Sequence, residues 1–166
     1  AKAAFRAGDV GKRTSINDQW NDENIGQSSV ALGRDTKASG FSSLATGSLT
    51  SAKSIFSTAM GDGTIASGET AMAMGKSTNA SGDVSTAMGQ DASASGDVSM
   101  AMGDNTIASG DFSTAMGIDT EASGNTSVSM GNGTEASGVV SFATGSATTA
   151  SGIGSTAMGS NTTAAT

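Results

Sequence analysis

A fourteen-residue repeat that begins at Ser29 constrains the fold of this chain more than any other feature of its sequence. Ten consecutive copies follow the pattern S-x-A-M-G-x-x-T-x-A-S-G-x-x, and the sequence ends inside the tenth. Glycine fills the fifth position and alanine the tenth in every copy, and threonine fills the eighth except at Ala92. The third position is alanine except at Ser129. A period this regular predicts an ordered repeat protein rather than a disordered chain.

Each copy is predicted to contain two short strands and no helix. Glycines recur seven residues apart, and a glycine inside a helix costs about 1 kcal/mol relative to alanine. Glycine at this spacing instead marks turns, where a positive φ carries no steric cost. Between the glycines the residues alternate in character, as in Val84-Ser85-Thr86-Ala87-Met88, which is the period of a strand.

The alternation also predicts which side chains point into the coil. The ninth position holds residues such as Lys37 and Glu121 and therefore faces water, so the threonine and alanine at positions eight and ten face inward. Serine and alanine at positions one and three would face them across a thin interior that only small side chains can fill. Each copy is then one coil of a parallel β-solenoid.

This arrangement leaves a stripe of methionine and other apolar side chains outside the first strand. Ten coils about 4.8 Å apart would expose about 500 Å² of apolar surface, which is large for a monomer. Three identical chains around an axis would cover it, and flexible methionine would fill the gaps. We therefore expect a homotrimer with an interface formed by Val30, Leu32, Leu44, Met60, Met72, Met74, Met88, Met100, Met102, Met116, Val128, Met130, Phe142 and Met158. In a competing geometry methionine lies inside a wider coil, and the chain is a monomer.

The glycines at positions five and twelve are the predicted turn glycines. They are Gly33, Gly40, Gly47, Gly61, Gly68, Gly75, Gly82, Gly89, Gly96, Gly103, Gly110, Gly117, Gly124, Gly131, Gly138, Gly145, Gly152 and Gly159.

Composition argues against catalysis. The chain has no histidine and no cysteine, which removes the usual bases, thiolates and soft metal ligands. Its net charge of −7 makes nucleic acid an improbable partner, and no apolar run approaches the roughly 20 residues that span a bilayer. We expect no enzyme activity, no cofactor and no direct membrane insertion by this segment. All eight basic residues precede residue 77, so the C-terminal half is the more acidic.

One acidic column is a candidate cation site. Glu69, Asp83, Asp97 and Asp111 occupy the thirteenth position of successive copies and would stack about 4.8 Å apart. Like charges at that distance repel, and a bound Ca²⁺ would relieve the repulsion. A solvated acidic ridge without a metal is the interpretation that we favour.

The repeat resembles the head repeat of the trimeric autotransporter adhesins, also called the YadA-like or haemagglutinin repeat. The family motif is S-V-A-[IL]-G followed by A-x-A-x-G, and "SVALGRDTKASG" at residues 29–40 is very close to it. The resemblance covers residues 29–166 and implies a left-handed parallel β-roll that trimerises on a bacterial surface, outside the cell, and adheres to host or matrix ligands. Here methionine largely replaces the isoleucine or valine at position four. Neither a coiled-coil stalk nor a membrane anchor is present in these residues, and no ligand-binding residue carries over from the motif.

Three alternatives remain open at this point. Related repeats occur in fibres of phages and of contractile injection machines. The open last coil predicts either a longer natural chain or end-to-end stacking into a filament. If the threonines of position eight faced outward, they would form a flat ladder like that of ice-binding solenoids.

Residues 1–28 do not follow the repeat strictly and are predicted to be an N-terminal cap or leader, with Phe5 and Trp20 covering the first coil. The alternative is an aromatic binding tip that includes Lys12 and Arg13. The second copy departs from the pattern at Lys53, Ser54, Ile55 and Phe56, which indicates a local change of turn. A sharper interpretation is an exposed contact spot formed by Phe41, Ile55 and Phe56.

Overall fold

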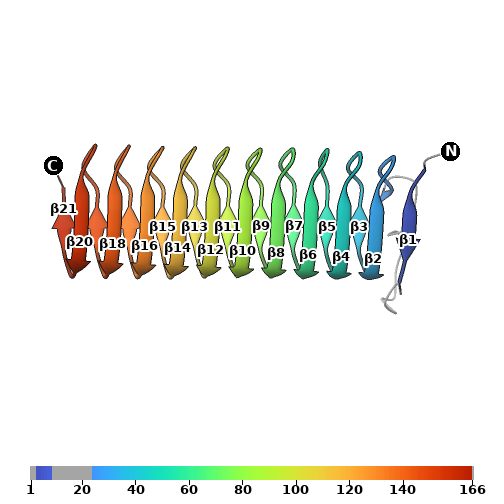
Figure 1. Ribbon diagram of the computed structural model, residues 1–166, viewed down its shortest axis with the longest axis horizontal. Coiled ribbons are helices and arrows are strands. Elements are labelled where there is room, and N and C mark those ends of the chain that lie inside the picture. Colours follow the sequence, from blue (N-terminus) through green and yellow to red (C-terminus); the bar gives the residue numbers. More distant parts are fainter. Residues whose placement is uncertain (1–2, 9–23, 166) are drawn as a thin grey trace.

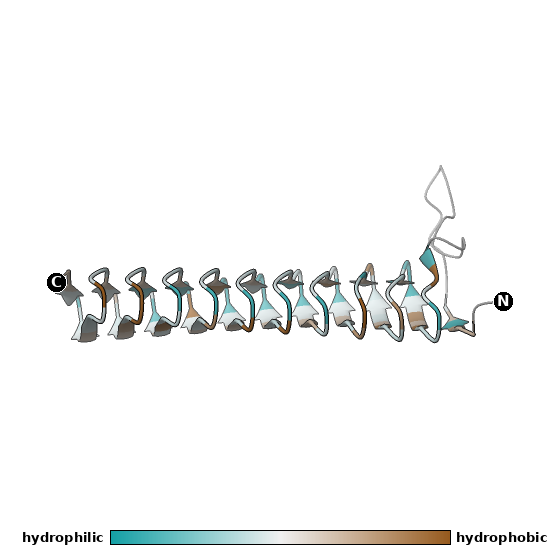
Figure 2. Cartoon of the chain, turned by 90° about the horizontal axis from the view of Figure 1, so that it is seen from above, coloured by the Kyte–Doolittle hydropathy of each residue, from teal (hydrophilic) through white to brown (hydrophobic). Residues whose placement is uncertain are grey.

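The computed structural model describes residues 3–8 and 24–165, which form a straight parallel β-solenoid (Figure 1). Each copy of the repeat contributes one five-residue strand and one two-residue strand. The long strands form one sheet and the short strands a second, and all pairs are parallel (Figure 2). Partners lie fourteen residues apart, as in Ala87 with Ala101, so the repeat predicts the register directly.

The long-strand sheet contains eleven strands in chain order, the first being β1 (Phe5–Ala7). The other ten are β2 (Val30–Arg34), β4 (Leu44–Ser48), β6 (Thr58–Asp62), β8 (Met72–Lys76), β10 (Thr86–Gln90), β12 (Met100–Asp104), β14 (Thr114–Ile118), β16 (Val128–Asn132), β18 (Phe142–Ser146) and β20 (Thr156–Ser160). The short-strand sheet consists of β3 (Lys37–Ala38), β5 (Ser51–Ala52), β7 (Ile65–Ala66), β9 (Asn79–Ala80), β11 (Ser93–Ala94), β13 (Ile107–Ala108), β15 (Glu121–Ala122), β17 (Glu135–Ala136), β19 (Thr149–Ala150) and β21 (Thr163–Ala164).

The interior is built from alanine, serine and threonine, as the alternation predicts. Alanines of positions three and ten, such as Ala87 and Ala94, are fully buried, and so are Ser85 and Thr78 of positions one and eight. The methionines of position four lie on the outer side of the long strands. The prediction of which side chains face inward is therefore confirmed, and the competing geometry with buried methionine is wrong. Thin coils explain the choice, because two strands of one coil approach too closely for larger side chains.

Two corners connect the strands of each coil. The exit corner follows the long strand and centres on position seven; the entry corner, at positions twelve to fourteen, precedes the next long strand. Position seven of all ten copies and position fourteen of the nine copies that contain it have φ between 51° and 67°, whether or not the residue is glycine. At both corners this residue donates its backbone N–H to the preceding coil, as Asp91 does to Lys76 O (2.9 Å) and Val98 to Asp83 O (2.8 Å). The left-handed conformation thus keeps the N–H on the stacking axis where the chain reverses.

The two glycine columns are required by stacking more than by turns. At position five, φ is between 110° and 135°, as predicted, but these glycines lie inside the long strands. At position twelve no positive φ occurs, so the prediction of a positive-φ turn is wrong there. A Cβ on Gly96 would instead come within 2.1 Å of Gly110 O in the next coil, and one on Gly89 within 2.0 Å of Gly103 O. Glycine is therefore favoured because successive backbones touch, and Ser54 is the one described residue of these two columns that carries a Cβ.

The solenoid begins before the first copy of the repeat. Strand β1 pairs with β2 in register, with Phe5 opposite Val30 and Arg6 opposite Ala31. Gly8 stacks on Gly33 as the later fifth-position glycines stack on one another, and Gly26 stacks on Gly40. Parts of residues 1–28 thus continue the coil geometry, with a long insertion between Gly8 and Gly26. The signal in the sequence is Gly8, which follows Phe5-Arg6-Ala7 as the fifth-position glycine follows positions two to four in each later copy.

Candidate functional site

The outward face of the long-strand sheet carries two rows of side chains, from positions two and four. Position four places methionine in six successive coils, from Met60 through Met130, each in register with the next. Most of these side chains are half-buried by their neighbours, and Met72 and Met100 of position two are 39% exposed. All fourteen residues predicted for the trimer interface lie on this face. Their burial by another chain stays a prediction.

Only some of the buried hydroxyl groups have a hydrogen-bond partner. At position one the Oγ atoms without a partner are those of Ser29, Ser113, Ser127, Ser141 and Ser155. Beside the entry corner, Ser99 Oγ donates to Gly96 O at 2.6 Å, and Ser85 donates likewise to Gly82 O. Beside the exit corner, the Oγ1 of the position-eight threonine is buried without a partner in six coils: Thr50, Thr64, Thr78, Thr106, Thr120 and Thr148.

These threonines face the core, so the outward ladder required by the ice-binding alternative does not exist in the structure. At position eight, the Oγ1 of Thr134 is within hydrogen-bond distance of another hydroxyl group. Ser129 stands where other copies have alanine, and its Oγ lies 2.7 Å from Thr134 Oγ1. Sequence inspection identified Ser129 only as an irregularity.

The acidic column has a structural role that the sequence did not indicate. The backbone N–H of Glu69 donates to Asp83 Oδ1 at 2.8 Å, and the N–H of Asp83 donates to Asp97 Oδ1 at 2.9 Å. The ladder continues from Asp97 N–H to Asp111 and from Asp111 N–H to Asn125. These carboxylates accept hydrogen bonds from backbone groups that would otherwise face only water. No group of three acidic side chains suited to a metal ion occurs in residues 3–8 and 24–165, so the Ca²⁺ site gains no support.

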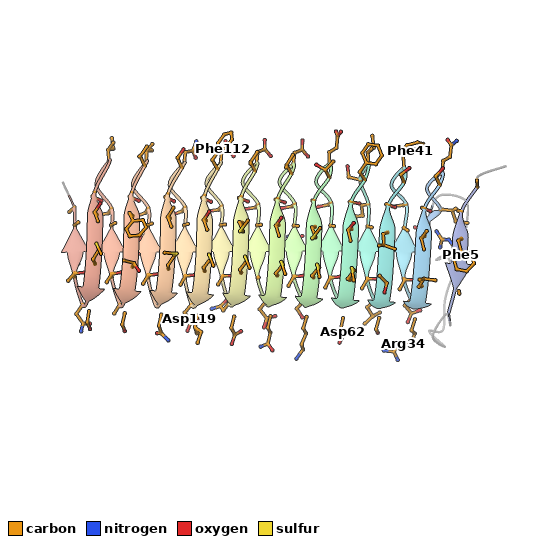
Figure 3. All side chains as sticks on the ribbon, in the orientation of Figure 1. Phe5, Arg34, Phe41, Asp62, Phe112 and Asp119 are labelled. Atoms are coloured by element: carbon orange, nitrogen blue, oxygen red, sulfur yellow. The ribbon has the colours of Figure 1, made fainter. Side chains whose placement is uncertain are left out.

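The entry corner also carries an apolar row. Phe41, Ile55 and Phe56, the predicted contact spot, are all exposed there, and the two rings meet edge to face with centroids 5.9 Å apart. Figure 3 shows Phe41 and Phe112 along this edge of the solenoid and Asp62 and Asp119 along the opposite edge. Exposed large apolar side chains therefore extend along the entry corner beyond the predicted spot.

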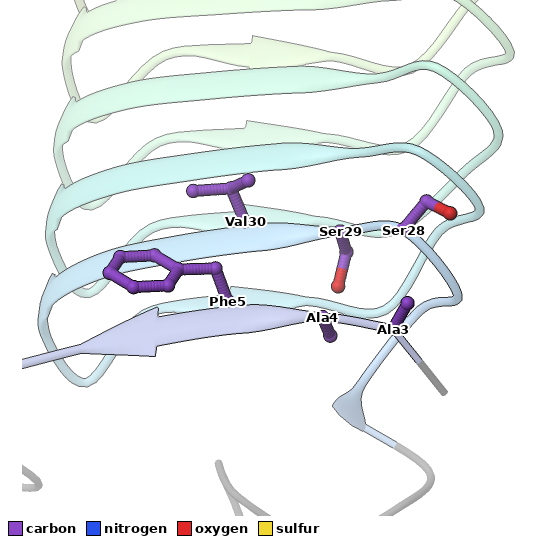
Figure 4. A pocket seen from close by; sticks show the side chains of 6 residues that line it. All are labelled: Ala3, Ala4, Phe5, Ser28, Ser29 and Val30. Atoms are coloured by element: carbon purple, nitrogen blue, oxygen red, sulfur yellow. The ribbon is translucent and has the colours of Figure 1, made fainter. Parts of the chain in front are cut away.

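The N-terminal end differs from the predicted aromatic cap. Phe5 lies beside Val30 on the outward face and is 61% exposed, so it does not cover the end of the core (Figure 4). Arg6 occupies the inward position instead, and it donates a hydrogen bond to Asn24 O. Burial lowers the pKa of the Arg6 guanidinium. Trp20, Lys12 and Arg13 lie outside the described residues.

A hollow of about 300 Å³ adjoins this end, but it gathers no charged groups; its lining is Ala3, Ala4, Phe5, Ser28, Ser29 and Val30 (Figure 4). Throughout the described part of the chain, no helix is long and apolar enough to cross a membrane. The features that stand out in residues 3–8 and 24–165 are therefore two extended surfaces, the outward face and the entry corner.

Comparison with known families agrees with the geometry. A family model described as the YadA head domain repeat (2 copies) matches residues 25–49, 38–64, 66–92, 80–106, 94–120, 136–162 and 150–166. The matches that start at residues 66, 80 and 94 are offset by fourteen residues, which is the length of one coil. No curated protein matches the chain. The matched segments cover well over half of the sequence, and the chain therefore belongs to the YadA head repeat family.

Proposed function

We propose that this chain is a segment of a bacterial surface adhesin head or fibre, in which three copies form a rigid rod that displays a repetitive surface. Membership of a family of structural adhesins supports this proposal. The observation that carries it is the outward face, where half-exposed methionines stand in register over six coils with no part of the described chain covering them. The function is attachment by display, without catalysis.

The physical argument for three chains starts from the exposed area. A continuous apolar stripe of about 500 Å² lies at the upper end of what monomeric proteins expose. A closed cyclic assembly covers such a stripe on every subunit and leaves no free copy of it. Methionine suits a shared axis because its unbranched, polarizable side chain fills irregular gaps.

A pair of matched charge substitutions tests the assembly. Met102→Asp places three carboxylates at the proposed axis without partners, which should dissociate the trimer. Ile107→Asp introduces the same charge on the outside of the short-strand sheet, where Ile107 is 38% exposed, and should leave the trimer intact. Sedimentation velocity measures the mass of each variant. Equal masses for the two variants would contradict the proposed interface.

The adhesive role needs its own test. Beads coated with the wild-type chain should bind at least one member of a panel of extracellular-matrix proteins or a host-cell surface. Beads coated with the Met102→Asp variant at the same density should bind more weakly, because the displayed surface is no longer held in a trimer. Absence of binding across the panel, with an intact trimer, would favour a fibre shaft such as those of phages or injection machines.

A further inference from the structure

The exposed apolar row along the entry corner is a second unpartnered surface. We define the entry ridge as the side chains of Phe56, Val84, Val98, Phe112 and Val140 at position fourteen. Each of them is 45–61% exposed. At position thirteen, Phe41, Ile55, Val139 and Ile153 extend the ridge at its two ends, and all four are exposed.

The backbone disfavours these side chains at this place. Every residue of the entry ridge has φ between 56° and 58°, a conformation that suits glycine, asparagine and aspartate and that β-branched residues rarely adopt. The exit corner imposes the same φ, and there seven of the ten copies use residues that tolerate it, namely Asp35, Gly63, Asp91, Asn105, Asp119, Gly133 and Asn161; the other three use Leu49, Ser77 and Ala147. Nine copies contain a position fourteen, and Gly154 alone belongs to that group there; the residues outside both the group and the entry ridge are Ser42, Thr70 and Thr126.

Contacts within the chain do not explain the choice. The ring contact between Phe41 and Phe56 joins two ridge residues of neighbouring coils, while Val84, Val98 and Phe112 remain about half exposed. The neighbouring acidic side chains point along the stacking axis, because Asp97 and Asp111 accept hydrogen bonds from the backbone of the preceding coil. The apolar side chains are therefore the ones free to meet another molecule. Strained residues that the fold does not need indicate a functional surface.

The entry ridge adjoins the outward face. Position fourteen lies two residues before position two, so Val98 and Met100 are neighbours in adjacent rows. A specific interface buries about 800 Å² on each partner, and the two rows of the outward face offer only about 500 Å² to be shared between two neighbours. The entry ridge and its extension at position thirteen place exposed apolar side chains in seven of the coils, which makes up part of this shortfall.

We propose that a neighbouring copy of this chain covers the entry ridge, so that the interface between subunits extends from the outward face around the entry corner. This inference rests on the proposed trimer. In a cyclic assembly the contact is heterologous, so the ridge of one subunit meets a different surface of the next. The surface of the neighbouring subunit that packs on the ridge must lack a dense acidic row, because Asp83, Asp97 and Asp111 flank the ridge and would repel it.

Replacing three ridge residues by asparagine tests this directly. In the triple variant Val84→Asn, Val98→Asn, Phe112→Asn, the left-handed backbone is preserved or favoured while the apolar contact is lost. We expect the dissociation constant of the trimer, measured by sedimentation equilibrium, to rise about a hundredfold or more. The control variant Ser77→Asn, Asp91→Asn, Ala147→Asn makes the same number of changes at the exit corner and should leave that constant unchanged.

The same ridge triple is then combined with Met102→Asp, which is designed to give a monomer. In that background the asparagines should raise the melting temperature, since they relieve the backbone cost without losing any contact. If the ridge triple has the same trimer dissociation constant as the wild-type chain, this inference is overturned and the proposed trimer stands. A wild-type monomer would overturn the trimer and this inference together.

Discussion

At the exit corner and at the entry corner, one residue in each coil has a φ between 51° and 67° and donates its N–H to the coil before it. The exit corner fills this position mostly with aspartate, asparagine and glycine, as in Asp91 and Asn105. The entry corner fills it mostly with valine, phenylalanine and threonine, as in Val98 and Phe112, and otherwise with Ser42 and Gly154. Both corners require the same backbone conformation, but they differ in their side chains. The residues of the exit corner therefore show what this conformation alone selects. We propose that the apolar side chains of the entry corner serve contacts with a neighbouring copy of the chain.

The largest effect is expected where a corner also depends on stacking. Gly96→Ala at the entry corner would place a Cβ 2.1 Å from Gly110 O, a backbone atom that cannot move aside, and should cost about 4 kcal/mol or more of unfolding free energy. Gly154→Ala lies at the same corner with φ +67° but meets no atom within 4 Å. It should cost about 1 kcal/mol, the cost of alanine in a left-handed conformation. Urea unfolding of both variants measures the difference, and equal losses would refute the stacking explanation.

A buried hydroxyl group with a hydrogen-bond partner and one without should respond in opposite directions when they are removed. Ser99→Ala removes a 2.6 Å hydrogen bond to Gly96 O and should destabilise the chain by about 1 kcal/mol. Thr106→Val removes a buried hydroxyl that has no partner and should be neutral or stabilise by about 1 kcal/mol.

Thr134→Val is the control for the threonine change. It leaves Ser129 Oγ without its 2.7 Å partner, so it should destabilise the chain where Thr106→Val does not. Thermal unfolding of the three variants gives the order of stability. If Thr106→Val lowered stability as much as Thr134→Val, the Oγ1 of Thr106 would have to make a hydrogen bond, which would contradict its assignment as unpartnered.

Exchanging residue types between the corners should have a smaller effect. In the Met102→Asp background, Asp91→Val should lower stability by about 1 kcal/mol, because a β-branched residue is forced into the left-handed region. Val98→Asn should raise stability by a similar amount for the opposite reason. Chemical denaturation measures both. Changes of the same sign in the two variants would mean that the backbone conformation does not determine the preferences of the corners.

The smallest effect is expected in the acidic ladder at the entry corner. Asp97→Asn keeps an oxygen that can accept the hydrogen bond from Asp83 N–H and removes one repelling charge, so stability should change by only a few tenths of a kcal/mol. Asp97→Ala removes the acceptor and should cost more, about 0.5 kcal/mol at this exposed position. Thermal melts with and without added Ca²⁺ complete the test. A large rise in melting temperature with Ca²⁺ that Asp97→Asn abolishes would restore the cation site.

Much of the fold could be predicted because the repeat determines it. The period specifies the register, and the alternation around Ala87 and Met88 specifies the facing of both strands. The conformation at Val98 could not be predicted, because a positive φ is signalled by glycine or asparagine and neither stands there. The role of Asp97 was missed because a stacked acidic column looks like a charge pattern until the backbone N–H beside it is seen. Strand β1 escaped notice because an insertion interrupts its coil between Gly8 and Gly26.

We propose that copies of the chain cover both the outward face and the entry ridge, and the mass of the wild-type protein in solution tests this proposal most directly. Light scattering at low micromolar concentration should give about 48 kDa, the mass of three 16.0 kDa chains in a closed assembly. A mass of 16 kDa would contradict the account, since the methionine rows and the entry ridge would then stay exposed to water.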